Sequence, residues 1–432
     1  MKHFDAGRSA RGFSLIELMV ALLLSLMLGG AVIAMMLTQT SVSRTQSGMR
    51  RVTENARFAM ETIAADIRNA AHQSCMNYSS GIGEFAPNAV VRVDRVQSMQ
   101  MRFDASAMPY SLGEPGNSSA YFVDPAEFVL GSECNGATCR PLPTKFRPVA
   151  NQPLPTIGTV AERRAAGADV LSLRYLAGRG MPIANVQYTR QDSQPVEVQL
   201  APGAQPRASL KAAVIADCGT AIAAQVSQHG SGLLQFAGNF ENDTAPMFDA
   251  RQTRVYDMET DLVSVSYYLK LRNHLPANGQ PQRLLSTLVR RENGNDVEIA
   301  PGVERLDFLF HVERSDGTTA VLPASEVGQD PSCRSAELPT TSAASSACGW
   351  RSLKGVEVFL LVNSVDDAVP TDTGKDATND TFRYAWLNDG TPNTDDVFET
   401  SSSISRLPNG LPPGRLLRKG FRTFVALRGY NH

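Results

Sequence analysis

The segment RGFSLIELMV, residues 11–20, opens an apolar run that extends from Phe13 to Leu37 and contains one carboxylate, Glu17. As an α-helix the run would span roughly 37 Å at about 1.5 Å per residue, enough to cross a bilayer. A carboxylate inside a membrane span is energetically costly and is usually retained for a function. We therefore expect a transmembrane helix over residues 13–37 in which Glu17 has a specific role.

The residues before this run have the character of a cytoplasmic leader. Residues 1–12 contain three basic side chains and one acidic one: Lys2, Arg8, Arg11 and Asp5. A secretory signal peptide has a shorter apolar core, followed by a small-residue cleavage site. Here the only obvious small cleavage residue, Gly12, precedes the core. Although basic residues also follow the span, we expect a cytoplasmic leader and a periplasmic body.

Composition narrows the function classes for the rest of the chain. The 432 residues can bury a substantial core and leave room for two or three domains. The net charge of −2 and the absence of a Lys/Arg-rich block argue against a nucleic-acid-binding protein, which needs basic surface to neutralise phosphates. With 42% apolar and 19% charged residues, the chain is typical of folded proteins.

Helical periodicity continues beyond the apolar run. Apolar residues recur mostly three or four positions apart, with charged residues between them: Val42, Met49, Val52, Ala56, Ala59, Ile63, Ile67 and Ala70. The pattern predicts one helix over residues 13–71, transmembrane over 13–37 and amphipathic over 38–71, with one face packed on a sheet. Gly29-Gly30 interrupts it with two poor helix formers, each costing about 1 kcal/mol, which suits close helix packing through small residues.

The remaining residues, 72–432, have a β-rich pattern. We predict strands at the following segments: 90–93, 98–103, 169–176, 195–200, 212–215, 220–227, 262–271, 283–291, 303–312, 355–363 and 421–428. Residues 263–268, VSVSYY, alternate as in a half-buried antiparallel strand. Because strands do not alternate with long helices, we predict an α+β fold. Long polar insertions are expected at residues 104–168, 315–350 and 364–420.

Six cysteines are spread over the β-rich part of the chain. An even number on the exported side of a membrane anchor favours disulfides, although six cysteines allow fifteen connectivities. The pairs Cys134–Cys139 and Cys333–Cys348 resemble local staples, which leaves Cys75 for Cys218. Zinc is the alternative, but no C-x-x-C pair is present and no histidine lies near a cysteine pair, so we predict no metal site.

Catalytic motifs are absent from the sequence. The histidines at 72, 229, 274 and 311 are scattered, without a G-x-S-x-G elbow or an H-E-x-x-H helix, so we predict no enzyme, no catalytic residues and no cofactor. We expect His311 on a partly exposed strand face. The acid-rich residues 366–399 lack the D-x-[DN]-x-[DN]-G calcium pattern, so a solvated loop is favoured over a calcium site.

Residues 11–20 resemble the processing signal of type IV prepilins. The resemblance implies cleavage after Gly12 by a prepilin peptidase and N-methylation of the new first residue, Phe13. Glu17 then occupies the fifth mature position, where in pilins it is thought to neutralise the N-terminal amine of a neighbouring subunit and to set the register. In pilin-like proteins the zone around Gly29-Gly30 can also unwind during assembly.

Segments of the head resemble the PilW type of minor pilin. They are Ala213–Cys218, Val263–Leu269, Gly302–Phe308 and Phe421–Arg428, in the same order along the chain. Near its C-terminus the chain departs from this type, with Arg428-Gly429-Tyr430-Asn431 where an Arg-Asn ending is more usual, and the insertions have no counterpart. The resemblance implies a pilin-like fold: a long N-terminal helix packed on an antiparallel sheet.

As a minor pilin the protein would start pilus assembly in the inner membrane as a single-pass protein and then stay near the pilus tip. Its partners would be other minor pilins, the major pilin, the peptidase and methyltransferase, the inner-membrane assembly platform and a tip adhesin, with roles in twitching motility and cell adhesion. A minor pseudopilin of a type II secretion system has the same leader and helix. A more distant alternative is a membrane-anchored periplasmic enzyme or ligand-binding adhesin.

Overall fold

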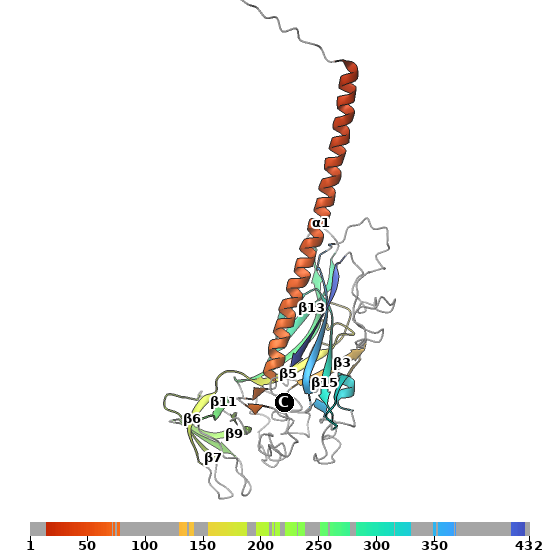
Figure 1. The fold of residues 1–432 in the computed structure, drawn as a ribbon. Helices are drawn as coiled ribbons and strands as arrows, with labels where there is room; N and C mark the ends of the chain where they lie inside the picture. The colour runs from red at the N-terminus through yellow and green to blue at the C-terminus, as the bar shows by residue number, and fades with distance from the viewer. Residues whose placement is uncertain are drawn as a thin grey trace, which may run out of the picture.

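A single long helix carries a β-rich head at its carboxyl end (Figure 1). The computed structural model describes residues 14–70, 72–73, 76–77, 129–135, 138–141, 154–187, 196–206, 210, 212–216, 221–230, 232–237, 251–257, 260–276, 282–314, 316–329, 349–350, 353–366, 368 and 416–427. Helix α1 spans Leu15–Ala70, 56 residues without a break. The short strands β1 (His72–Gln73) and β2 (Met76–Asn77) follow it as an antiparallel pair.

Two antiparallel sheets form the body of the head. The six-stranded sheet has the order β14-β13-β12-β5-β3-β4. Its strands are β3 (Val129–Asn135), β4 (Thr138–Arg140), β5 (Val170–Leu176), β12 (Leu262–His274), β13 (Arg283–Glu292) and β14 (Asn295–Pro301). The four-stranded sheet has the order β16-β15-β17-β18. Its strands are β15 (Val303–Glu313), β16 (Thr319–Pro323), β17 (Leu353–Asn363) and β18 (Arg418–Ala426), and α3 (Ala324–Val327) follows β16.

One hydrophobic core joins α1 to both sheets. The helix contributes a face of small and branched side chains, all fully buried: Val52, Ala56, Ala59, Ile63 and Ile67. The six-stranded sheet contributes Leu173, Val265 and Tyr267, and the four-stranded sheet contributes Phe308, Phe310 and Val358, among others. Alanines on the helix let its backbone approach the sheets closely, while the larger strand side chains fill the space between them.

Six further strands close into a separate barrel between β5 and β12. The order around it is β10-β7-β6-β11-β8-β9, with β9 paired back to β10. The strands are β6 (Met181–Gln187), β7 (Val196–Leu200), β8 (Ala212–Ala216), β9 (Ala221–Gly230), β10 (Leu233–Ala237) and β11 (Arg254–Asp257). The barrel has a core of its own, which includes Val198, Ile215, Leu234 and Val255. It lies to one side of the carboxyl end of α1, at the end of the molecule opposite the first turn of the helix (Figure 1).

The predicted α+β class is confirmed, and most predicted strands lie within a few residues of observed ones. Two predicted strands, at residues 90–93 and 98–103, lie outside the described residues. Nine observed strands were not predicted: β1, β2, β3, β4, β6, β10, β11, β14 and β16. The insertions expected at residues 104–168 and 315–350 are wrong in part, because they contain β3, β4, β16 and α3.

Two predictions of burial are also wrong. Residues 263–268 are buried on both faces, because Tyr268, Val170 and Val289 form a second small core on the side of the sheet away from α1. On α1 the predicted apolar face includes Val42 and Met49, which are 48% and 40% exposed. The buried face of α1 begins at Gly48 and Val52, and the amino-terminal part of the helix extends beyond the sheets (Figure 1).

Candidate functional site: the N-terminal helix and its junction with the head

The first turn of α1 is closed by Glu17. The backbone N–H of Ser14 donates a hydrogen bond to Oε2 of Glu17 at 3.2 Å, and the N–H of Leu18 donates to the Ser14 carbonyl at 3.1 Å. Ser14 and Glu17 therefore have the spacing and one of the two reciprocal bonds of a capping box. A negative charge in the first turn also interacts favourably with the helix dipole. Gly12 and Phe13 lie outside the described residues.

An uninterrupted apolar surface surrounds the amino-terminal half of α1. Every residue from Ser14 to Thr40 is exposed, and large side chains such as Leu15 and Met27 are 78% and 71% exposed. Within the part of the chain that the structure describes, α1 is the one helix long and apolar enough to cross a membrane. Isolated in water this surface would be highly unfavourable, which is consistent with a single-pass membrane anchor.

Contact with the head begins near Thr45. Its hydroxyl donates to the carbonyl of Ala368 at 3.0 Å. One turn later there is no room for a side chain at Gly48, because a Cβ at this position would lie 2.5 Å from the Ala368 Cβ. Arg51 then forms an ion pair with Asp366 at 2.8 Å. The glycine thus lets Ser364 and Ala368 lie directly against α1.

Asp366 is shared between the helix and the six-stranded sheet. Its second carboxylate oxygen lies 3.2 Å from Nε2 of His274, at the end of β12. Partial burial opposes ionisation of Asp366, but the hydrogen bonds from His274 and Arg51 outweigh it and lower the pKa of the carboxyl. Of the acid-rich stretch predicted as a solvated loop, this first residue is instead an anchor for α1. Residues 369–399 lie outside the described part of the chain.

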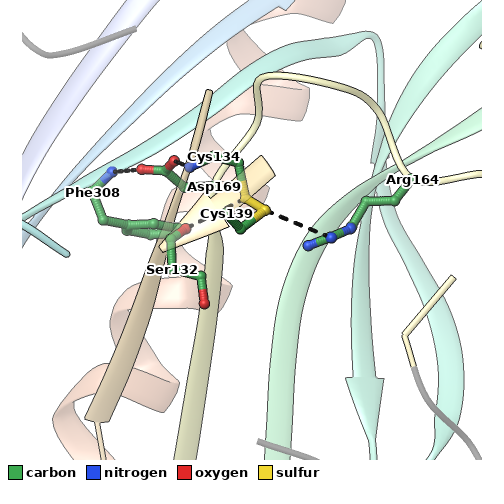
Figure 2. The surroundings of a disulfide bond; sticks show 6 residues. All are labelled: Ser132, Cys134, Cys139, Arg164, Asp169 and Phe308. Atoms are coloured by element: carbon green, nitrogen blue, oxygen red, sulfur yellow. Dashed lines mark hydrogen bonds between the residues drawn. A yellow bond between two sulfur atoms is a disulfide. The ribbon is translucent and has the colours of Figure 1, made fainter. Parts of the chain in front are cut away.

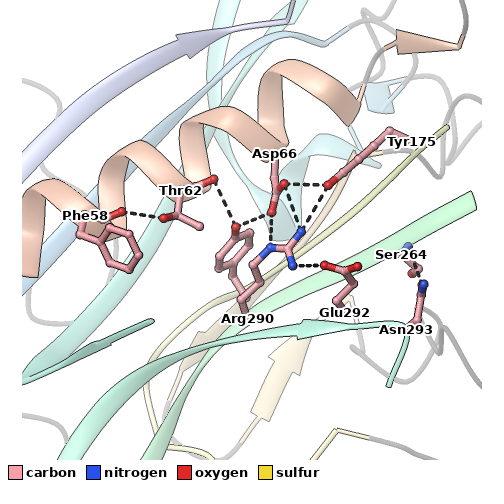
Figure 3. A network of polar contacts seen from close by, with 9 residues as sticks. Phe58, Thr62, Asp66, Tyr175, Ser264, Arg290, Glu292 and Asn293 are labelled. Atoms are coloured by element: carbon pink, nitrogen blue, oxygen red, sulfur yellow. Dashed lines mark hydrogen bonds and ion pairs between the residues drawn. The ribbon is translucent and has the colours of Figure 1, made fainter. Parts of the chain in front are cut away.

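Asp66 joins the last turn of α1 to the six-stranded sheet (Figure 3). Its carboxylate accepts from Nε of Arg290 at 2.6 Å and from the Tyr175 hydroxyl at 2.8 Å, and also from the Tyr267 hydroxyl. Burial, followed by the adjacent carboxylate, raises the pKa of both tyrosines, so they remain neutral donors. Arg290 also pairs with Glu292. A carboxylate on the buried face of the helix is therefore fully satisfied by strands β5, β12 and β13.

The cysteine predictions can be compared with the structure at one pair. Cys134 and Cys139 form a disulfide that links β3 to β4 (Figure 2), so this predicted staple is confirmed. The hairpin is attached to the rest of the head by Asp169, whose carboxylate accepts from the N–H of Cys134 at 2.8 Å and from the N–H of Phe308 at 3.1 Å. Cys75, Cys218, Cys333 and Cys348 lie outside the described residues.

The described residues contain no group of three or more His, Cys, Asp or Glu side chains that could hold a metal ion. Of the histidines, His274 pairs with Asp366, and the ring of His311 lies on Phe424 with centroids 4.6 Å apart. His311 is partly exposed on β15, in agreement with the sequence prediction.

Two features of this site were missed by sequence reasoning. The S-x-x-E spacing of Ser14 and Glu17 carries the capping-box signal and could have been recognised. Asp66 follows the buried Ile63 on the same face of the helix, and an acid at such a position indicates a buried partner. Its partners on three different strands could not be identified without the fold.

Comparison with known proteins assigns the first part of the chain. Residues 7–33 match the model of the prokaryotic N-terminal methylation motif, the prepilin-type signal. The chain therefore carries a pilin-like or pseudopilin-like amino terminus, which implies processing by a prepilin peptidase and assembly with other pilin-like subunits. No significant match was found among curated proteins or among solved structures.

Proposed function

We propose that this protein is a minor pilin that helps to start type IV pilus assembly and stays at the pilus tip. The observation that carries the proposal is Glu17 in the first turn of an exposed apolar helix, next to a Gly12–Phe13 junction within a prepilin-type signal. Cleavage after Gly12 would create a cation at Phe13 inside the hydrocarbon. A carboxylate from a neighbouring subunit would lower the cost of burying that cation.

The capping interaction gives Glu17 a second role within its own chain. A cap alone would be satisfied by glutamine, which also accepts the Ser14 N–H bond. Pairing with a neighbour's amine needs the negative charge. A relay or pore function is disfavoured, because Glu17 is the single titratable side chain in the apolar run of residues 13–37.

The junction between α1 and the head suits a subunit that is pulled from a membrane into a filament. Force applied to the exposed part of α1 would reach the head through the Gly48 contact, the Arg51–Asp366 pair and the Asp66 cluster. These contacts lie at both ends of the buried part of the helix. They would keep the head in a fixed orientation during extraction.

The size and shape of the head favour a minor over a major subunit. The barrel built from β6 to β11 adds bulk to one side of α1 (Figure 1). A lateral extension of this kind would crowd a lattice in which every subunit is the same. A position at the tip has no neighbours above it and tolerates the extension.

A minor pseudopilin of a type II secretion system is the second candidate, because the methylation motif at residues 7–33 does not distinguish it from a pilin. Other minor pilins, the major pilin and an inner-membrane assembly platform are the proposed partners in the first case. We propose an assembly role without catalysis. Binding of a tip adhesin to the head, or adhesion by the barrel itself, would account for the size of the head.

The test uses three variants in the native host: Gly12→Ala, Glu17→Gln and Ser14→Ala. Gly12→Ala should leave the protein unprocessed. Glu17→Gln should be processed but fail to support filaments, while Ser14→Ala should assemble. Loss of surface pili and twitching favours the pilus, whereas loss of protein secretion with normal pili favours the pseudopilin. Normal pili and normal secretion in Glu17→Gln would refute the proposal.

A further inference from the structure

Arg164 is a buried cation that pairs with no carboxylate among the described residues, and it lies beside the disulfide of the β3–β4 hairpin (Figure 2). The residue is only 6% exposed. Its Nη2 points at Sγ of Cys139 from 3.7 Å, while Nε and Nη1 are buried and have no hydrogen-bond partner in the part of the chain that the structure describes. Burial lowers the pKa of Arg164 to about 10, although the nearby Tyr268 opposes this effect.

The backbone around Arg164 fixes this position. Its N–H donates to the Thr156 carbonyl at 3.1 Å, and its own carbonyl accepts from Gly158 at 3.0 Å. An isolated antiparallel β-bridge between Arg164 and Lys270 joins the backbone of this segment to β12. Asp296, which accepts a hydrogen bond from the neighbouring Tyr268, already pairs with Arg291 at 2.6 Å and with Lys270 at 3.3 Å.

The two sulfurs of the disulfide have opposite environments. Cys139 faces the guanidinium, whereas Sγ of Cys134 lies 3.7 Å from the Ser132 carbonyl oxygen. After reduction, a thiolate at Cys139 would give Arg164 the negative partner that it lacks. A carbonyl oxygen instead favours the protonated thiol, which could donate to it. Of the carboxyl groups at the hairpin, Glu133 accepts a hydrogen bond from the Ser325 hydroxyl, and burial, followed by Asp307, raises the pKa of Asp169.

We propose that Cys134–Cys139 is an exchangeable disulfide in which Cys139 is the leaving thiolate, stabilised by Arg164, and that its partner is a dithiol reductant or oxidoreductase. A thiolate of the partner attacks Sγ of Cys134, the S–S bond breaks, and Cys139 departs with the electron pair. The second partner thiol then attacks the mixed disulfide and is oxidised with the first. Cys134 leaves and takes up a proton, so two electrons pass to the protein.

Access to the sulfurs requires opening of β4. Both cysteines are 4% exposed, but β4 has three residues, lies at the edge of the sheet, and exposes Thr138 and Arg140 on either side of Cys139. Short edge strands open locally at low free-energy cost. Reduction would remove the covalent link across the hairpin and release this edge of the head, so the thiol state would control the shape of that surface.

The proposal is tested with the full-length protein in micelles, equilibrated in dithiothreitol buffers and mapped by alkylation and mass spectrometry of the Cys134 and Cys139 peptides. In the reduced protein Cys139 should alkylate at a lower pH than Cys134. Both sulfurs are cross-strand partners, so hairpin opening affects them together. Arg164→Met should abolish the difference and make the disulfide at least tenfold harder to reduce, a shift of about 30 mV.

Two further variants distinguish the charge of Arg164 from its packing. Arg164→Lys keeps the charge and should keep Cys139 as the more acidic thiol. Arg163→Met removes an exposed neighbouring charge and should behave as wild type. If Arg164→Met fails to fold, the proposal is tested by whether Cys139 alkylates before Cys134 in the wild type and in Arg164→Lys. Equal reactivity of the two thiols, or faster alkylation of Cys134, would overturn the proposal, as would an unchanged potential in a folded Arg164→Met protein.

Discussion

Replacement of Asp66 by alanine should release the last turns of α1 from the head. Asp66 is 6% exposed, and its ion pair with Arg290 joins side chains that are 8% and 16% exposed. Removal of one member of a buried pair costs about 3–5 kcal/mol. Arg290 keeps Glu292 as a partner, and its Nη2 still reaches the Tyr175 hydroxyl at 3.3 Å, so we expect a loss near the lower limit, about 3 kcal/mol.

The assay is amide hydrogen exchange of the full-length protein in micelles, followed over the peptides that cover residues 56–70. A loss of about 3 kcal/mol corresponds to exchange roughly a hundredfold faster. Asp66→Asn keeps an acceptor for the tyrosines and should show a smaller increase. Glu61→Ala breaks an exposed pair with Arg57 on the opposite side of the helix and should leave exchange unchanged. Less than a threefold increase in Asp66→Ala would refute the role assigned to Asp66.

Three other predictions follow from the geometry. Gly302→Ala places a Cβ at φ +82° and 2.6 Å from Oδ1 of Asn363, so it should cost about 2 kcal/mol or more in urea unfolding, and an unchanged midpoint would contradict this. In Gly29→Ala and Gly30→Ala the added Cβ meets nothing within 4 Å, so each change should stabilise the helix by about 1 kcal/mol. Circular dichroism should show higher helicity. If assembly requires this part of the helix to unwind, the yield of filaments should fall. Burial, followed by the neighbouring Asp307, raises the pKa of Asp169, so the folded state retains a proton that the unfolded state loses. The contribution of Asp169 to stability should therefore decrease as pH rises above about 4. The urea midpoint of Asp169→Asn should rise relative to wild type over this pH range, and a constant difference would argue against the prediction.

The helix and the central strands could be predicted from sequence because their patterns are local. The apolar run and the periodic small residues specify α1, and continuous apolar runs specify β15 and β17. The prediction failed where burial depends on distant segments. Ser264 and Ser266 look like a solvent face, but both are buried, and the Ser266 hydroxyl shares a hydrogen bond of 2.9 Å with Ser172.

The barrel was not predicted because closure leaves no signature within any one strand. Its strands are short, several carry few β-branched residues, and their pairing joins residues far apart in sequence, such as β11 with β6 and β8. In the candidate site, too, local features could be predicted from sequence and long-range contacts could not. Gly12, Phe13 and Glu17 could be recognised from a ten-residue motif, whereas the partners of Asp66, Arg51 and Arg164 depend on the folded head.

The central claim is that cleavage after Gly12 produces a subunit whose first residue is Phe13 and whose fifth is Glu17. The most direct measurement is the mass of the amino-terminal peptide of the protein recovered from membranes and from filaments of the native host. The account predicts a peptide that begins at Phe13 and carries one methyl group on its amine. A peptide that begins at Met1, or at a residue beyond Leu37, would contradict it.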